Sequence, residues 1–120
     1  MSRVLCDVNI PRPASRLLAH HEIEFADRRG WRELTNGDLL NAAEREGFDV
    51  LLTADTNIRY QQNLAARRIA IVALSTNAWP VVRDNPGPVI QAVDEATPGS
   101  YREVDLPRPT SRRSGSERKR

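Results

Sequence analysis

The stretch of residues 49–57 constrains the fold of this chain more than any other. It places four apolar or β-branched residues (50–53) between Asp49 and Asp55. This pattern predicts a short strand that is buried on both faces, as in a parallel sheet. Ligands of open parallel sheets bind in the crevice beyond the carboxyl ends of the strands, so Asp55 is a candidate site residue.

The rest of the chain alternates between strand and helix patterns. Strands are expected at residues 3–6, 22–26, 50–53, 69–74 and 101–104, with helical patterns near residues 11–21, 35–47, 57–67 and 88–93. This alternation predicts an α/β fold, a three-layer α/β/α sandwich with a mainly parallel sheet and helices on both faces.

Three aspartates stand where such a fold would gather functional groups. Asp7 and Asp55 each follow a strand that is expected to be buried. Because parallel strands deliver their carboxyl ends to one edge, we expect these two carboxylates to approach each other. Asp38 lies near the start of the second expected helix, and its carboxylate would lie near those of Asp7 and Asp55 if that helix begins at the same edge of the sheet. The surrounding oxygen and amide groups are expected to come from Asn9, Thr53, Asn57 and Ser75.

Crowded carboxylates repel one another unless one is protonated or a cation binds. Oxygen ligands without cysteine or paired histidine favour Mg²⁺ or Mn²⁺ over zinc, and such an ion can activate water for phosphodiester hydrolysis. The sequence therefore predicts that Asp7, Asp38 and Asp55 are catalytic metal ligands. Polar residues on the following helix are candidate RNA contacts, namely Arg59, Gln61 and Gln62.

Each of the three aspartates also has a structural interpretation. Asp55 precedes a helix and is suited to cap it, and Asp7 can form an Asx-turn ahead of Pro11. Asp38 stands three residues after Thr35, which is close to a capping box.

Charge divides the 120-residue chain into two parts. Residues 107–120 carry six basic and one acidic side chain, whereas residues 1–106 carry 12 basic and 15 acidic ones. We expect residues 1–106 to form one domain and residues 107–120 to be a disordered basic tail, either a solubilising extension or an arm attracted to nucleic acid. The absence of a long apolar run or signal peptide, together with a single cysteine, predicts a cytoplasmic protein that does not cross a membrane.

Two motifs resemble the bacterial PIN-like domains, the relatives of VapC-type toxins. They are residues 7–11 (Asp-Val-Asn-Ile-Pro) and residues 51–57 (Leu-Leu-Thr-Ala-Asp-Thr-Asn), and Asp38 matches the helix-start aspartate of the family. The resemblance spans residues 3 to about 105. It implies a PIN-like fold and a Mg²⁺- or Mn²⁺-dependent endoribonuclease acting on RNA. It also implies a toxin role beside a small antitoxin protein, and a homo-oligomer, commonly a dimer.

The sequence departs from the family pattern at two positions. Val8 stands where many relatives have glutamate, and Asn57 stands where aspartate is common. Both changes lower the negative charge, which favours the alternative of a non-catalytic PIN-like module that binds RNA or protein. A phosphoacceptor receiver domain fits less well, because only one acid follows the first strand and Lys119 is the only lysine.

Overall fold

A computed structural model describes residues 1–61 and 63–107 of the chain. Its centre is one five-stranded sheet in the order β2-β1-β3-β4-β5, with every neighbouring pair parallel. The strands are β1 (Arg3–Cys6), β2 (Glu22–Phe25), β3 (Val50–Thr53), β4 (Ala70–Leu74) and β5 (Tyr101–Val104). The expected α/β class and parallel sheet are therefore confirmed.

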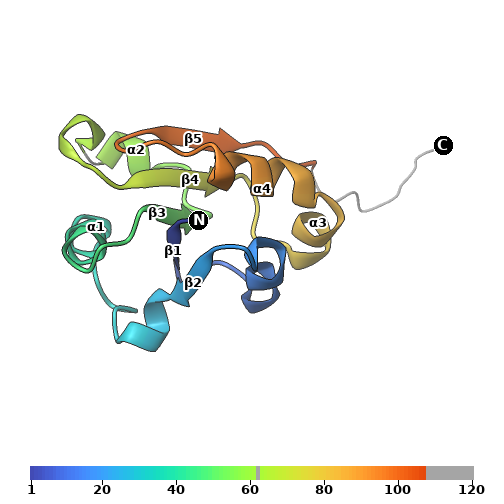
Figure 1. Ribbon diagram of the computed structural model, residues 1–120, viewed down its shortest axis with the longest axis horizontal. Coiled ribbons are helices and arrows are strands. Elements are labelled where there is room, and N and C mark those ends of the chain that lie inside the picture. Colours follow the sequence, from blue (N-terminus) through green and yellow to red (C-terminus); the bar gives the residue numbers. More distant parts are fainter. Residues whose placement is uncertain (62, 108–120) are drawn as a thin grey trace.

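Helical segments connect the strands and cover both faces of the sheet (Figure 1). They are η1 (Arg12–Leu18), η2 (Ala26–Arg29), α1 (Asn36–Arg45), α2 (Ile58–Gln61), η3 (Leu64–Ala66), α3 (Trp79–Asp84) and α4 (Pro86–Asp94), where η marks 3₁₀ helices. In the view of Figure 1, α1 and α2 lie to the left of the sheet and α3 and α4 to its right.

Two helices differ from the sequence-based expectation. The first connection is a 3₁₀ helix rather than an α-helix, and Pro11 and Pro13 at its start supply no backbone N–H to an α-helical ladder. The expected helix over residues 57–67 is split into α2 and η3. Asn63 has extended dihedral angles, φ −82 and ψ 92, which interrupt the helix before η3 begins.

The core consists of two apolar clusters, one on each face of the sheet. Leu5, Leu51 and Ile71 pack with residues of α1, whereas Val4, Leu52 and Val72 pack with residues of η1, α3 and α4. All residues of β3 and β4 are buried, as the apolar runs in the sequence predict. Each fully buried leucine or isoleucine contributes about 1.5–3 kcal/mol to folding, so these two strands anchor the molecule.

The strand order creates a topological switch point between β1 and β3. From this central pair the chain moves outward to β2 on one side and to β4 on the other. Cys6 is in register with Leu52, and the backbone N–H of Asp7 donates to the carbonyl oxygen of Leu52 at 2.9 Å. Asp7 and Thr53 therefore lie side by side at the carboxyl edge, where parallel sheets of this order bind ligands.

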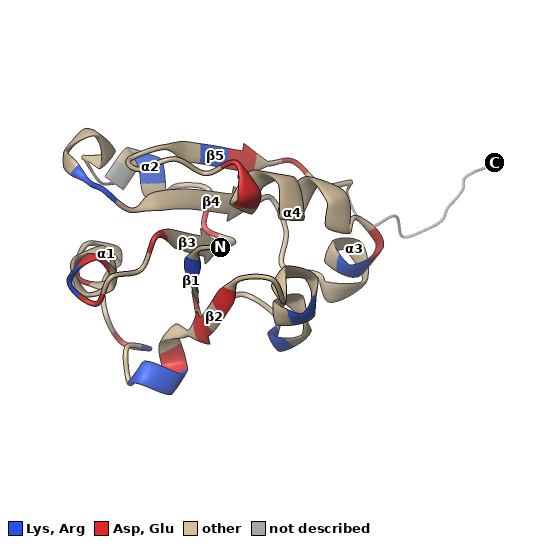
Figure 2. Ribbon diagram, in the orientation of Figure 1, with Lys and Arg blue, Asp and Glu red and all other residues tan. Residues whose placement is uncertain are grey.

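One edge of the sheet is formed by β2, which has β1 as its only neighbour among the strands of the described part of the chain. Arginine-bearing segments of η1 and η2 lie close to this edge strand (Figure 2). The predicted tail is outside the described residues from Arg108 onward. No helix in the described ranges is long and apolar enough to span a membrane.

Candidate active site

The hydroxyl of Thr53 connects the two strand-end aspartates. Thr53 is fully buried, and its Oγ1 donates to Oδ2 of Asp7 at 2.8 Å. The same oxygen accepts the backbone N–H of Asp55 at 3.1 Å. One side chain at the end of β3 thus fixes both Asp7 and the first residues of the loop that carries Asp55.

Asp7 is nearly buried, with 8% of its surface exposed. Its Oδ1 accepts the N–H of Val8 at 2.8 Å, so each carboxylate oxygen has one hydrogen bond. A carboxylate offers about four lone-pair positions, so each oxygen retains acceptor capacity. Burial, with the nearby Asp7 carboxylate adding to its effect, raises the pKa of the Cys6 thiol to about 12. Cys6 is therefore a protonated thiol within the apolar core.

Asp55 is held by two donors on different segments. Its Oδ1 accepts the N–H of Asn57 at 3.0 Å, and its Oδ2 accepts Nδ2 of Asn36 at 3.1 Å. Asn36 is the first residue of α1, so this helix begins at the carboxyl edge of the sheet. The sequence reasoning did not identify Asn36 as a site residue, although it considered the neighbouring Thr35 and Asp38.

Asn9 orders the backbone around the two aspartates. Its Oδ1 accepts the N–H of Ala54 at 3.0 Å, and its carbonyl oxygen accepts Nδ2 of Asn77 at 3.1 Å. The loops after β1, β3 and β4 are therefore linked to one another. Two of the surrounding groups that the sequence proposed, Asn9 and Thr53, thus contact the segments that carry Asp7 and Asp55.

Asp38 lies in the first turn of α1 and is exposed. Its backbone N–H donates to Oγ1 of Thr35 at 3.2 Å, so Thr35 is the N-cap of this helix. The part of the predicted capping box in which the Thr35 side chain accepts the backbone N–H of residue 38 is thus confirmed. A role of the Asp38 carboxylate in the site stays a prediction.

The remaining candidates lie in different surroundings. Ser75 Oγ accepts the N–H of Leu106 at 2.8 Å, which ties the end of β4 to the residues after β5. Arg59 donates to the hydroxyl of Tyr60, and its guanidinium carbon lies 5.4 Å from the centre of the Tyr101 ring. Gln62 and the side chain of Gln61 are outside the described part of the structure.

The three aspartates share an electrostatic property. Within residues 1–61 and 63–107, none of Asp7, Asp38 and Asp55 forms a salt bridge with an arginine or histidine. The donors to Asp7 and Asp55 are a hydroxyl, backbone N–H groups and an amide, all of which are uncharged. The carboxylates of Asp7 and Asp55 are therefore oriented by uncharged donors alone among the hydrogen bonds of the described residues.

One cluster of three potential metal ligands occurs elsewhere in the described residues. Among their His, Cys, Asp and Glu side chains, it is the one set of three whose ligand atoms all lie within 4.8 Å of one another. It consists of His20, His21 and Asp94. Nδ1 of His21 accepts the N–H of Ser2 at 2.9 Å, so Nε2 carries the ring proton and donates to Asp94 at 2.7 Å. A histidine that binds a metal through Nε2 needs an acceptor at Nδ1, whereas His21 faces a donor there. The arrangement thus links the turn after η1 to the end of α4.

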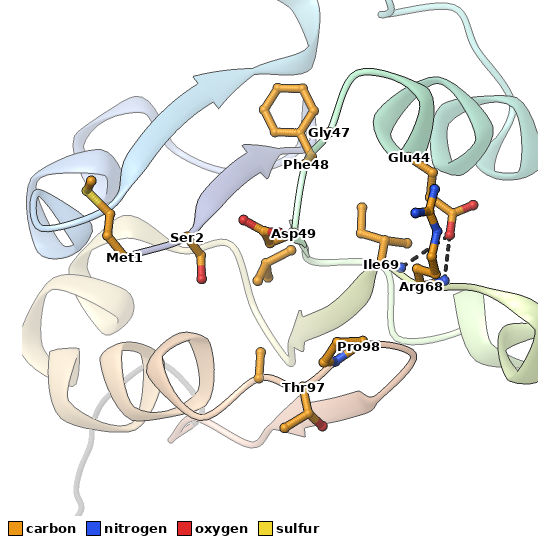
Figure 3. A pocket seen from close by; sticks show the side chains of 12 residues that line it. Met1, Ser2, Glu44, Gly47, Phe48, Asp49, Arg68, Ile69, Thr97 and Pro98 are labelled. Carbon is orange, nitrogen blue, oxygen red and sulfur yellow. Dashed lines mark hydrogen bonds between the residues drawn. The ribbon is translucent and has the colours of Figure 1, made fainter.

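A hollow of ≈ 470 Å³ opens at the opposite, amino ends of the strands (Figure 3). Asp49 and Glu44 line it, and Figure 3 shows Glu44 bonded to the backbone N–H groups of Arg68 and Ile69. Neither Asp7 nor Asp55 contributes to this hollow. Glu44 is also paired with Arg67 at 3.0 Å, a contact with a cationic side chain that neither Asp7 nor Asp55 has among the described residues.

Comparisons of the chain with protein-family models, with curated proteins and with solved structures find no match. The resemblance to PIN-like domains therefore rests on the two motifs and the helix-start aspartate described above.

Proposed function

We propose that the protein is a metal-dependent endoribonuclease of PIN-like type, with its site at the switch point between β1 and β3. The observation that carries the proposal is that Asp7 and Asp55, which Thr53 links at one edge of the sheet, are held by uncharged donors without a basic partner among the described residues. Unpaired carboxylates at a partly buried position favour the binding of a cation.

The donor set fits Mg²⁺ or Mn²⁺ by its chemistry. Asp7, Asp55 and the side-chain oxygens near them are hard oxygen ligands, and no cysteine or histidine is hydrogen-bonded to either aspartate in the described residues. Mg²⁺ is commonly held by only one or two protein carboxylates together with water and substrate phosphates. Two strand-end aspartates are therefore sufficient, and Asp38 would add charge from the first turn of α1.

Each residue of the site has a separate task in this proposal. Asp7 and Asp55 would hold Mg²⁺ or Mn²⁺, and the bound ion would supply Lewis-acid activation of water and of the phosphodiester. Thr53 fixes the carboxylate of Asp7 relative to the backbone of Asp55. Asn36 and the N–H of Asn57 hold the Asp55 carboxylate in one orientation, which limits the reorganisation required when the ion binds.

A non-catalytic RNA-binding or protein-binding module is the second candidate. Val8 is 42% exposed and Asn57 is exposed, and because neither side chain is a carboxylate, neither position adds negative charge to the edge. A site with fewer charges binds a divalent ion less tightly. The toxin role, the small antitoxin partner and the homodimer follow from the resemblance alone and remain proposals.

The test measures Mn²⁺ binding and RNA cleavage in parallel. Asp7→Asn and Asp55→Asn each remove one charge with little change in shape, and we expect each to weaken Mn²⁺ binding at least about tenfold in calorimetric titration. Asp105→Asn is the matched control, because Asp105 is exposed and follows the edge strand β5. We expect this control to bind Mn²⁺ and cleave RNA like the wild type.

The outcomes separate the two candidates. Mn²⁺-dependent cleavage that is lost in Asp7→Asn and Asp55→Asn but kept in Asp105→Asn supports the nuclease. RNA binding without cleavage in any metal condition favours the binding module. Circular dichroism of each variant checks that the fold is retained.

A further inference from the structure

A second hollow lies along the outer edge of β2, between η1 and η2. It has a volume of ≈ 510 Å³. Four of the residues that line it are arginines, and Ile23 and Phe25 of β2 contribute apolar surface. We call this feature the arginine groove; its arginines are Arg12, Arg16, Arg28 and Arg29.

The four guanidinium groups fall into two pairs with different surroundings. Arg12 is paired with Asp27, and Arg29 is paired with Glu24 and Glu46. Arg16 and Arg28 are exposed and have no acidic partner among the described residues. The groove therefore combines two positioned arginines with two whose charge is available to an anion.

The groove also contains an ordered aromatic surface. The guanidinium carbon of Arg12 lies 4.6 Å from the centre of the Phe25 ring, which is close enough for a cation–π interaction. Arginine side chains beside an aromatic ring are a common platform for single-stranded nucleic acid, in which phosphates contact the charges and bases stack.

The position of the groove connects it with the candidate active site. Arg12 begins η1, five residues after Asp7, and the intervening turn is closed by a hydrogen bond from the N–H of Ile10 to the carbonyl oxygen of Asp7 at 3.0 Å. Phe25 ends β2 in register with Cys6, the residue before Asp7. The groove therefore adjoins the carboxyl edge of the sheet, one strand away from the carboxylate pair.

We propose that the arginine groove binds the sugar-phosphate backbone of single-stranded RNA and leads it to Asp7 and Asp55. Arg16 and Arg28 contact successive phosphates, while Arg12 and Arg29, whose charges are balanced by Asp27, Glu24 and Glu46, form the wall behind them. This inference rests on the proposed function for the identity of the substrate. It assigns RNA binding to the β2 edge, whereas the sequence alone suggested Arg59, Gln61 and Gln62.

The experiment measures binding separately from cleavage. Full-length protein is titrated against a labelled single-stranded RNA of about 20 nucleotides in EDTA, and the affinity is followed by fluorescence anisotropy at several salt concentrations. The test variant is Arg16→Ala with Arg28→Ala. The matched control is Arg45→Ala with Arg68→Ala, two exposed arginines without an acidic side-chain partner among the described residues.

Both double variants remove two positive charges, so a difference between them reports position rather than net charge. Loss of two phosphate contacts should weaken binding about 25-fold at about 0.1 M salt and reduce the slope of log K against log salt by about 1.4. We expect the control to change affinity less than about threefold. Equal losses in both variants, or no loss in either, would overturn the proposal.

Two further outcomes separate the groove from the rest of the site. If the wild type does not cleave RNA but the groove variant alone loses RNA affinity, the nuclease proposal fails and the groove stands. If the wild type cleaves RNA and the groove variant binds and cleaves equally well, the groove proposal fails alone. Arginine-dependent binding of labelled poly-glutamate without binding of RNA would assign the groove to an acidic peptide and overturn the RNA proposal.

Discussion

The two ends of the parallel sheet differ in whether arginine side chains pair with any of their carboxylates, as they do with Glu22 and Glu44 at the amino ends. At the amino ends, Arg3 lies 3.3 Å from Glu22 and donates its backbone N–H to Asp49, while Glu44 is bonded to Arg67 and to two backbone N–H groups. At the carboxyl ends, Asp7 and Asp55 meet only uncharged donors among the described residues.

The difference separates structural carboxylates from those suited to a cation. Burial by itself would raise the pKa of Glu44, but the hydrogen bonds from Arg68, Ile69 and Arg67 outweigh it and lower the pKa. Its charge is therefore satisfied within the fold. Asp7 and Asp55 are oriented by uncharged donors and have no salt-bridge partner among the described residues, which suits an edge that binds a cation.

Glu44→Ala should have the largest effect on stability. The Glu44 side chain is 19% exposed and accepts hydrogen bonds from three N–H groups that fix the start of β4. We expect the free energy of unfolding to fall by about 3 kcal/mol, measured by urea denaturation. Glu46→Ala is the control, since its single contact with Arg29 is at a 43% exposed side chain and should contribute less than about 1 kcal/mol. Equal losses in the two variants would contradict the distinction.

The contribution of Glu44 to the free energy of unfolding should depend on pH. Because the pKa of Glu44 is lower in the folded than in the unfolded protein, its contribution is complete above the unfolded value, 4.5, and is lost as the pH falls through the folded value. Glu44→Gln should therefore lose less stability than the wild type on acidification below about pH 4.5.

Thr53→Val should have the next largest effect, at the carboxyl end. The substitution keeps the shape but removes the hydroxyl that serves Asp7 and the backbone of Asp55. Leaving these buried groups without a partner should cost about 2 kcal/mol in urea denaturation. Thr53→Ser keeps the hydroxyl and should lose about 1 kcal/mol, for one buried methyl group. If Thr53→Val were as stable as Thr53→Ser, the two hydrogen bonds of the Thr53 hydroxyl would contribute nothing to the stability of the fold.

The sequence was sufficient for the parts of the structure that depend on local patterns. The apolar runs of β3 and β4 predicted buried parallel strands, and the ends of β1 and β3 predicted the placement of Asp7 and Asp55 at one edge. Asn36 could not be found in this way, because its contact with Asp55 depends on where α1 docks. The contact of Ser75 with Leu106 likewise depends on the pairing of β4 with β5, which is set by the strand order. The arginine groove is also non-local, since it requires η1 and η2 to flank one edge strand.

Asp38→Asn should have the smallest effect and would define the limit of the candidate site. Asp38 is exposed in the first turn of α1, where a negative charge interacts favourably with the helix dipole, so its loss should cost about 0.5 kcal/mol. An exposed charge near the site, but not in contact with the ion, should change Mn²⁺ affinity about threefold, and calorimetric titration measures this. Glu33→Gln is the control for an exposed charge outside the helix. Unchanged affinity would remove Asp38 from the site, whereas a loss of tenfold or more would make it a direct ligand like Asp55.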